Sequence, residues 1–433
     1  MEASSLYRYY QEYPSISTDT RAVKPNSLFF ALKGANFNGN TFAGEALEKG
    51  ARYAVIDEPR YRTDGRFLLV EDVLASLQSL AQYHRTQLQI PVIGITGSNG
   101  KTTTKELLFA VLSRKFNTYA TLGNLNNHIG VPLTLLSLDE ETELAIIEMG
   151  ANHPGEIAIL SGIAQPSHGL ITNVGKAHLE GFGGFDGVKR TKGELYDYLV
   201  SHGGTVFLQG DNPHLYEMAE SRAIVHPVTY GFSERNDIVG ELLSADPFLE
   251  VKWCARGDKQ TYTVRTQLTG TYNAENLLAA VCVGRYFGVP PQEISAGISG
   301  YAPANNRSQI TETALNRVIR DYYNANASSM AAALENLQLL RADRKVIILG
   351  DMFELGDESF DEHRKILQKA CSVGASRVIF VGHAFGQHSH SGAEFYETTD
   401  EAKVALARNP IKDALVLLKA SRSMAFEKLM DSL

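Results

Sequence analysis

Short apolar runs separated by polar, turn-forming stretches recur along the whole chain of 433 residues. In the first ninety residues such runs occupy positions 27–32, 53–56 and 67–70, which predicts a small α/β domain. The chain is longer than the roughly 250–300 residues at which a single hydrophobic core stops growing, so two or three domains are expected.

From residue 91 onward, apolar runs alternate with stretches of helical periodicity. The runs at 91–95, 144–147, 169–172 and 205–208 predict a mostly parallel sheet covered by helices, with functional loops at the carboxyl ends of the strands. The stretch 230–264 alternates in the manner of antiparallel strands, and positions 273–286 return to a helical pattern.

A third α/β unit is predicted after residue 303. Its strands are expected at 317–320, 345–349, 377–381 and 414–418, and each is followed at once by polar or glycine residues, so four loops should meet at one edge of its sheet. The predicted architecture is therefore α/β with three domains: a small N-terminal α/β domain at 1–88, a central domain with a mostly parallel sheet at 89–303, and a C-terminal Rossmann-like domain at 304–433.

The segment from Gly94 to Thr104 reads Gly-Ile-Thr-Gly-Ser-Asn-Gly-Lys-Thr-Thr-Thr and links a predicted strand to a predicted helix. Backbone N–H groups, the helix N-terminus and the Lys101 ammonium would together bind a polyphosphate, and the Thr102 hydroxyl could bind a phosphate-associated Mg²⁺. The spacing is G-x-x-G-x-x-G-K-T and departs from the strict P-loop pattern. It indicates a nucleotide, most simply ATP, and leaves the other substrate open.

Polar side chains follow two further predicted strands of the central sheet. Glu148 follows the run at 144–147, Asn173 ends the next run, and His178 lies in the loop after it. A carboxylate at the end of a strand parallel to the P-loop strand can hold Mg²⁺ opposite Thr102. The alternative for Glu148 is a solvated strand-end side chain, and a lone loop histidine often has no special role.

Lys192 falls on the same helical stripe as Val188, Leu195 and Leu199, which points it inward. A buried ammonium is costly, so the lysine must be paired, have a lowered pKa or be modified. A free amine could react with CO₂, and the carbamate would supply anionic oxygen ligands to a second metal ion. The alternative is a lysine that snorkels to solvent or forms a salt bridge.

Composition narrows the classes of function. The net charge of −8 argues against a dedicated nucleic-acid-binding protein. The N-terminus does not resemble a signal peptide and no apolar run is long enough to span a bilayer, so we expect a cytoplasmic protein without membrane insertion. The three cysteines, Cys254, Cys282 and Cys371, lack metal or disulfide spacing and are expected to be buried thiols.

Several segments together, in order and spacing, resemble the Mur ligases of peptidoglycan synthesis. The resemblance extends from about Ser17 to the C-terminus. The segments are the loop 94–104, Asn124 to Leu135, Glu148 to Gly155, Asn173 to Gly184, Lys192 to Tyr196 and Tyr272 to Ala280. Within the family, the segments Thr18 to Arg21, Leu28 to Gly34 and Asp321 to Asn326 resemble the ligases that add D-alanyl-D-alanine to UDP-MurNAc-tripeptide. Two positions depart from the family pattern. The family often has a proline where this chain has Ala327, and a histidine where this chain has Asn40.

The resemblance implies a role for each matching residue. Lys101, His178 and Lys192 are the expected catalytic residues. The ATP phosphates would be held by Gly97, Ser98, Asn99, Gly100, Lys101, Thr102 and Thr103. One Mg²⁺ would be held by Thr102 and Glu148, and a second by His178 with carbamylated Lys192. Asn273 and Asn276 would approach the adenine, Arg307 and Asp321 the phosphate and ribose, and Tyr323, Asn324 and Asn326 the nucleotide or dipeptide. The expected contacts of the UDP-linked peptide and of the dipeptide are Asp19, Thr20, Arg21, Asn124, Asn126, Asn127, His128, Lys419, Ser421 and Arg422.

The expected activity is therefore ATP-dependent amide ligation through an acyl phosphate, by a monomer whose substrates are UDP-N-acetylmuramoyl-tripeptide and D-alanyl-D-alanine. Two alternatives share this chemistry, namely the ligase that adds the third amino acid and a folylpolyglutamate synthase. The first usually carries an Asp-Asn-Pro-Arg motif in its last domain, whereas the near match Asp211 to His214 lies in the central domain here. An alternative of another class is a P-loop ATPase switch that forms no bond.

Overall fold

The computed structural model describes residues 1–176 and 179–433. In the N-terminal part four short strands form a parallel sheet in the order β1-β2-β5-β6. The strands and the hairpin beside them are β1 (Ile16–Ser17), β2 (Leu28–Phe30), β3 (Lys33–Gly34), β4 (Phe37–Asn38), β5 (Tyr53–Ile56) and β6 (Phe67–Leu69). The helices are α1 (Ala3–Glu12), α2 (Ala43–Glu48) and α3 (Val73–Gln87), with 3-10 turns η1 (Thr20–Ala22), η2 (Gly39–Phe42) and η3 (Pro59–Tyr61).

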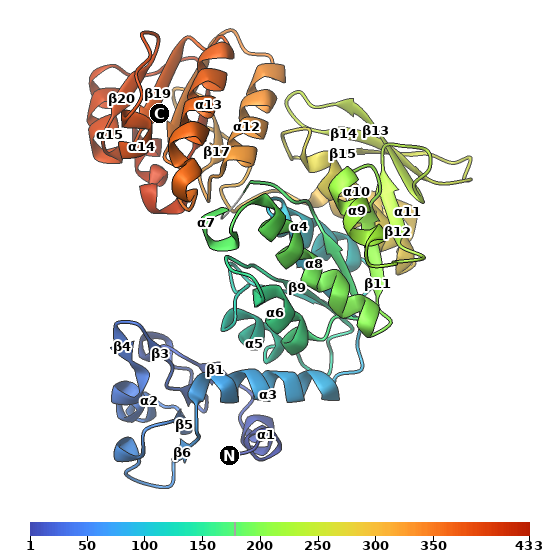
Figure 1. Cartoon of the computed structure of the whole chain (residues 1–433), viewed down its shortest axis with the longest axis vertical. Helices are drawn as coiled ribbons and strands as arrows, with labels where there is room; N and C mark the ends of the chain where they lie inside the picture. The colour runs from blue at the N-terminus through green and yellow to red at the C-terminus, as the bar shows by residue number, and fades with distance from the viewer. Residues whose placement is uncertain (177–178) are drawn as a thin grey trace.

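Helix α3 connects this unit to the central one (Figure 1). The Asp72 side chain caps it by accepting a hydrogen bond from the Ala75 N–H at 2.7 Å. Its buried side chains, among them Leu77 and Leu80, belong to the same hydrophobic cluster as Leu135 and Ile163 of the central unit. The N-terminal unit is thus fixed to the body of the molecule through one long helix.

The central unit contains a nine-stranded sheet in the order β15-β14-β13-β12-β11-β10-β7-β9-β8. Its strands are β7 (Val92–Thr96), β8 (Thr118–Ala120), β9 (Leu144–Glu148), β10 (His168–Ile171), β11 (Thr205–Gln209), β12 (Val228–Gly231), β13 (Ile238–Ser244), β14 (Glu250–Ala255) and β15 (Tyr262–Arg265). The pairs β13–β14 and β14–β15 are antiparallel and the others are parallel, as the alternation in 230–264 predicts.

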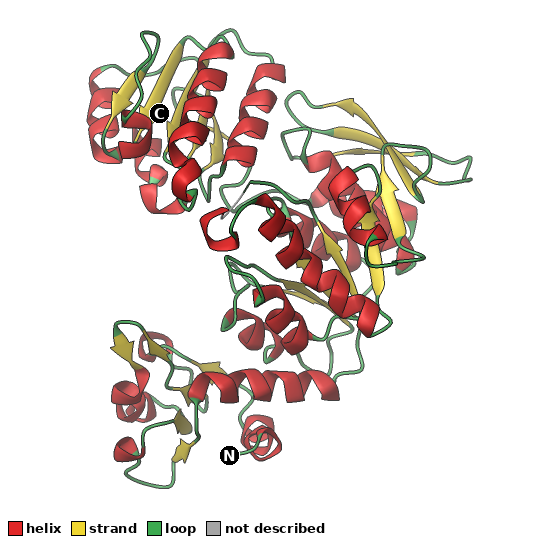
Figure 2. Cartoon of the chain, viewed as in Figure 1, coloured by secondary structure: helices red, strands yellow, loops and turns green. Residues whose placement is uncertain are grey.

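Helices cover both faces of this sheet (Figure 2). One face packs against α5 (Gly130–Leu135), α6 (Glu156–Ala164) and α8 (Phe185–Ser201). The other packs against α4 (Lys101–Leu112), α10 (Asn273–Tyr286) and α11 (Pro291–Gly300). The remaining helices are α7 (Leu179–Phe182) and α9 (Pro213–Glu220). The parallel strands β7, β9, β10 and β11 are buried on both faces and so are continuous apolar runs, which made them recognisable in the sequence.

The C-terminal unit has six strands in the order β16-β17-β21-β18-β19-β20. They are β16 (Gln309–Glu312), β17 (Arg317–Asp321), β18 (Lys345–Gly350), β19 (Arg377–Val381), β20 (Glu394–Tyr396) and β21 (Leu415–Lys419), and all pairs except β16–β17 are parallel. The helices are α12 (Ala327–Leu339), α13 (Ser359–Ser372), α14 (His383–Gly386) and α15 (Thr399–Arg408), with turns η4 (Gly356–Glu358), η5 (Arg422–Met424) and η6 (Phe426–Ser432). The four loops expected to meet at one sheet edge do so, because β17, β21, β18 and β19 are adjacent and parallel.

The α/β class and the predicted strands are confirmed. The expectation of buried thiols is wrong for two of the three cysteines. Cys282 is buried, but Cys254 and Cys371 are only half-buried because each lies close to the end of its strand or helix, where the cover is incomplete. Within the described ranges, no helix combines the length and apolar content needed to cross a membrane.

Candidate active site

The loop 97–100 connects β7 to α4, and two glycines determine its shape. Gly100 is the N-cap of α4 with φ +79°, and a Cβ there would lie 2.7 Å from the Asn276 amide oxygen. Gly97 has φ +145°, and a Cβ there would overlap the Thr172 hydroxyl. Only glycine satisfies both the conformation and the space. The N-terminus of a twelve-residue helix therefore points into the site, as expected for a phosphate-binding loop.

The loop is anchored to the end of the neighbouring strand β10. The Ser98 N–H donates to the Asn173 carbonyl oxygen and the Asn99 N–H to the Asn173 side-chain oxygen, both at 3.0 Å. The Ser98 hydroxyl bonds to Gly175. The strand-end Asn173, which the sequence indicated only by its position, thus fixes the backbone of the phosphate loop.

Lys101 folds back over the loop. Its ammonium donates to the carbonyl oxygens of Gly97 at 2.6 Å and Ser98 at 3.2 Å. Burial lowers the pKa of Lys101 to about 8, and the charge of Glu148 opposes that shift. Two carbonyl oxygens of the loop therefore hold the amine beside the N-terminus of α4.

Glu148 ends β9, which pairs with β7 on the side opposite β10. Its carboxylate is buried at 2% exposure, and Oε1 accepts hydrogen bonds from the Asn126 amide at 2.8 Å and the Thr102 hydroxyl at 3.3 Å. The other oxygen, Oε2, is buried and has no hydrogen-bond partner among residues 1–176 and 179–433. A buried unpaired carboxylate oxygen beside a hydroxyl suits a cation, which would supply the missing partner.

Lys192 lies in α8 and is 2% exposed, so the prediction that it points inward is confirmed. Its Nζ is 3.4 Å from the Ala151 carbonyl oxygen and 5.1 Å from the centre of the Phe182 ring. Among residues 1–176 and 179–433, no carboxylate lies within ion-pair distance of it. Burial lowers the pKa of Lys192 to about 7. His178, the expected companion of Lys192, lies outside the described residues.

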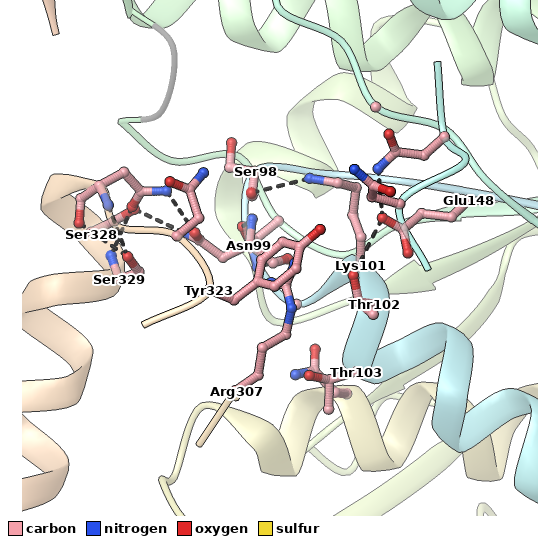
Figure 3. Close-up of a pocket in the computed structure, with 18 of the residues that line it drawn as sticks. Ser98, Asn99, Lys101, Thr102, Thr103, Glu148, Arg307, Tyr323, Ser328 and Ser329 are labelled. Atoms are coloured by element: carbon pink, nitrogen blue, oxygen red, sulfur yellow. Dashed lines mark hydrogen bonds between the residues drawn. The ribbon is translucent and has the colours of Figure 1, made fainter. Parts of the chain in front are cut away.

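A cleft of about 630 Å³ joins the phosphate loop to the C-terminal unit (Figure 3). The predicted residues that line it are Ser98, Asn99, Gly100, Lys101, Thr102, Thr103, Asn124, Asn126, Asn127, His128, Glu148, Asn273, Asn276, Arg307, Asp321, Tyr323, Asn324, Asn326 and Lys419. Residues more than 200 positions apart in the chain therefore meet in one cavity.

Two charged groups from the C-terminal side already have partners. The Arg307 guanidinium stacks on the Tyr323 ring, 4.0 Å from its centre, while its Nε is buried and has no hydrogen-bond partner in the part of the chain that the structure describes. Lys419 is 2% exposed, and its Nζ donates to the Asp321 carboxylate at 2.7 Å and the Asn324 carbonyl oxygen at 3.3 Å. Lys419 therefore holds the segment 321–324 in place, whereas Arg307 retains a free donor.

Other predicted residues lie away from the cleft lining. Asp19, Thr20 and Arg21 lie at η1 in the N-terminal unit, where the Arg21 guanidinium donates to Asp19 at 2.6 Å and lowers the pKa of that carboxyl to about 2. Ser421 is buried and accepts a hydrogen bond from the Phe353 N–H at 3.3 Å, and Arg422 is exposed. Gly97, the first residue of the loop, and the buried Lys192 are also outside the lining.

Asn40 is 1% exposed and bonds to Asp57 twice, donating from its amide at 2.8 Å and accepting from the Asp57 N–H at 3.1 Å. The residue that departs from the family pattern thus joins η2 to the end of β5.

Sequence reasoning did not select Tyr272, Ser308 and Ser328, which also line the cleft. For Ser328 the sequence offered one local signal. Asn326 and Ser329 are three residues apart, which is a helix-capping pattern and places Ser328 at the start of a helix.

The segment Asp211 to His214, the near match to the Asp-Asn-Pro-Arg motif, has a structural role. Asp211 accepts hydrogen bonds from the Phe232 and Ser233 N–H groups at 2.5 and 3.1 Å, and the Asn212 side chain caps α9. These contacts lie within the central unit, as its position in the sequence indicated.

Comparison with known proteins agrees with this arrangement. Three family models match: the Mur ligase family catalytic domain at 12–85, the Mur ligase middle domain at 95–284, and the Mur ligase glutamate ligase domain at 306–424. The chain is 33% identical over 432 residues to a UDP-N-acetylmuramoyl-tripeptide--D-alanyl-D-alanine ligase of Bacillus subtilis, covering 96% of this chain and 92% of the relative.

Solved structures resemble the whole molecule. MurF from Acinetobacter baumannii superposes with a TM-score of 0.89 at 31% identity, covering 100% of this chain and 98% of the other. MurF ligase from Thermotoga maritima, solved in complex with ADP, gives 0.85 at 26% identity with 96% of each chain covered. The likeness of sequence and structure over essentially the full length shows that the chain belongs to the Mur ligase family.

Proposed function

We propose that this chain joins D-alanyl-D-alanine to UDP-N-acetylmuramoyl-tripeptide and converts ATP to ADP and phosphate. The observation that carries the proposal is the full-length similarity to a ligase named for this reaction, at 96% coverage of this chain. The cleft supports it, because the phosphate loop faces the segment 321–326 of the C-terminal unit across one cavity. This arrangement brings ATP and a second substrate together.

The reaction begins when the terminal carboxylate of the UDP-linked peptide takes the γ-phosphoryl group of ATP, which gives an acyl phosphate and ADP. The dipeptide amine then attacks the acyl carbon. The C–N bond forms, the bond to the phosphate oxygen breaks, and the amine loses its proton. The loop amides and Lys101 hold the phosphates and balance their charge. The C-terminal unit covers the cleft and excludes water, which would otherwise hydrolyse the acyl phosphate.

The donor set at Glu148 fits Mg²⁺. The unpaired Oε2 of Glu148 and the adjacent Thr102 hydroxyl would hold one ion. Carbamylated Lys192 and His178 would hold a second. Bound Mg²⁺ would screen the phosphate charges and stabilise the transferring phosphoryl group.

The first ion site is tested by Glu148→Gln. We expect the rate of ligation to fall at least about a hundredfold, and the variant to need a higher Mg²⁺ concentration for saturation than the wild-type chain. The matched control is Glu143→Gln. Glu143 directly precedes β9 and lies at the opposite end of the same strand. Equal effects of the two substitutions would contradict the assignment.

The carbamate on Lys192 rests on burial without an acidic partner among the described residues. Lys192→Ala should abolish most ligation, and short carboxylic acids should partly restore it by placing an anionic group in the space left behind. Lys189→Ala is the control, because Lys189 lies on the same helix and pairs with Glu217 at 2.7 Å near the surface. Full activity of Lys192→Ala would refute the carbamate.

We further propose the domain bounds 1–88, 89–303 and 304–433, with the UDP group held by the first domain near Asp19 to Arg21. Asn273 and Asn276 lie at the start of α10 and line the cleft, and we propose that they contact the adenine. A monomeric, cytoplasmic enzyme is consistent with these assignments.

The function is tested by incubating the full chain with ATP, Mg²⁺, UDP-MurNAc-tripeptide and D-alanyl-D-alanine, and measuring ADP and product mass. We expect ADP release only when both substrates are present, with a product heavier by the dipeptide less one water. Absence of that product would refute the assignment. Addition of a single amino acid to a UDP-dipeptide would favour the neighbouring ligase, and ATP hydrolysis independent of both substrates would favour an ATPase switch.

A further inference from the structure

Three side chains form a closed ring of hydrogen bonds between the phosphate loop and the C-terminal unit (Figure 3). The Asn99 amide donates to the Ser328 hydroxyl at 2.8 Å, that hydroxyl donates to the Asn326 side-chain oxygen at 2.9 Å, and the Asn326 amide donates to the Asn99 side-chain oxygen at 2.8 Å. We call Asn99, Asn326 and Ser328 the clamp ring. The two units it joins are separated by more than 220 residues in the sequence.

Both sides of the clamp ring are rigid. Asn99 is held through its backbone, because its carbonyl oxygen accepts from the Thr172 hydroxyl at 2.5 Å and its N–H donates to the Asn173 side chain. Asn326 is the N-cap of α12, where its side-chain oxygen accepts from the Ser329 N–H at 2.9 Å. The ring therefore connects the central sheet to a thirteen-residue helix without a flexible link.

The hydrogen bonds of the clamp ring occupy side-chain polar groups at the edge of the cleft. The Asn326 side-chain oxygen already accepts two hydrogen bonds, from Ser328 and Ser329. The Asn99 side chain faces the C-terminal unit, whereas Ser98, its neighbour in the loop, bonds within the central unit. The side chain of Asn326 thus serves the contact between the units, and its expected contact with the nucleotide or dipeptide stays a prediction.

Gly175 lies directly against this contact. A Cβ on Gly175 would lie 2.9 Å from the Ser328 hydroxyl and 3.6 Å from the Asn99 amide nitrogen. Gly175 needs no unusual backbone conformation, since its φ lies outside the positive range. The absence of a side chain at this position therefore leaves room for Ser328.

We propose that the clamp ring positions the phosphate loop for phosphoryl transfer only when the C-terminal unit is docked, so that Asn99, Asn326 and Ser328 are positioning residues. The proposal rests on the proposed function, because it assigns the dipeptide side of the reaction to the C-terminal unit. Displacement of a reacting group by about 1 Å costs of the order of a hundredfold in rate, so a loop held from one side only would be a poor catalyst.

The test compares Ser328→Ala, Asn99→Ala and the double variant. We expect kcat for ligation to fall about tenfold or more in each single variant, since each opens the ring, while the Kd for ADP stays within about threefold because the backbone amides and Lys101 remain. The double variant should be no slower than the slower single variant, as both break one ring. Ser328→Thr keeps the hydroxyl and should retain kcat within about threefold.

Gly175→Ala should reproduce Ser328→Ala without altering any ring residue. Thr269→Val is the matched control. It removes a different contact between the two units, the hydrogen bond of 3.0 Å from the Asn336 amide to the Thr269 hydroxyl, and should leave kcat within about threefold because it does not involve the loop. Additive losses in the double variant, or wild-type kcat for Ser328→Ala, would overturn the proposal.

A second readout is independent of the reaction. Hydrogen exchange followed by mass spectrometry should show faster exchange at 97–101 in Ser328→Ala with ADP bound, although Ser328 lies in the other unit. Faster exchange confined to α12 would refute the positioning role. Should the wild-type chain form no product with D-alanyl-D-alanine, the proposed function fails, and the exchange experiment still decides the clamp ring.

Discussion

Gly97→Ala is the sharpest test of why the phosphate loop has its shape. Gly97 has φ +145°, and a Cβ built on it would overlap the Thr172 hydroxyl. Thr172 is 5% exposed and its hydroxyl donates to the Asn99 carbonyl oxygen at 2.5 Å, so it is not free to rotate away without losing that bond. The substitution therefore opposes both the backbone conformation and a neighbouring anchor of the loop.

The magnitude follows from two terms. A non-glycine residue at positive φ costs about 1–2 kcal/mol, and loss of the Thr172 hydrogen bond costs about 0.5–1.5 kcal/mol. Together they give about 1.5–3.5 kcal/mol, which corresponds to a loss of about 10- to 400-fold in nucleotide affinity if the loop must be restored to bind phosphate. The assay is calorimetric titration with ADP, with thermal unfolding as the check that the chain still folds.

A second substitution isolates the steric overlap. Thr172→Ala removes the hydroxyl that the added Cβ would overlap. The hydrogen bond to Asn99 is lost in both cases, so tighter ADP binding by the double variant Gly97→Ala/Thr172→Ala than by Gly97→Ala alone, which we expect, measures the relief of that overlap. Thr172→Ser is the matched control, because it keeps the hydroxyl and should give no such relief. If the alanine and serine double variants bind ADP equally, the steric explanation is wrong.

Three further predictions follow from buried groups. Lys105→Met should lower the free energy of unfolding by about 1–3 kcal/mol in urea titrations, because it leaves the buried Thr121 carbonyl oxygen, now bonded at 2.5 Å, without a donor; an unchanged value would contradict this. Ala327→Pro should raise the unfolding free energy by about 0.4–1 kcal/mol and preserve ligation, since position N1 of α12 suits proline and the preceding residue is extended at φ −144°; lost ligation would show that the buried site lacks room. Burial lowers the pKa of His168 to about 4. Below about pH 6.5 the unfolded chain therefore binds a proton on this imidazole while the folded chain does not, so the free energy of unfolding falls as the pH drops from about 6.5 toward 4. In His168→Phe the difference in unfolding free energy between pH 7 and pH 4 should shrink by about 1–3 kcal/mol, the range being reduced for partial exposure of the ring, and an unchanged difference would refute that origin.

Much of the fold could be predicted because local sequence records burial. Strands such as β9 and β18 are buried on both faces and so are continuous apolar runs, and Lys192 stands out only because its helical stripe is otherwise apolar. The weakest prediction concerned cysteine burial. Burial at the ends of elements depends on what packs there, which local sequence does not record.

The sequence by itself determined the phosphate loop, the strand-end Glu148 and the inward Lys192, because each depends on local geometry and on a periodicity of a few residues. Only the tertiary structure placed β9 and β10 on either side of β7, stacked Tyr323 on Arg307, paired Lys419 with Asp321, and brought Ser328 to Asn99. These contacts depend on how crossover connections order the strands and how one unit docks on another. Such choices are made by packing over long separations, so they leave no periodic pattern in the chain.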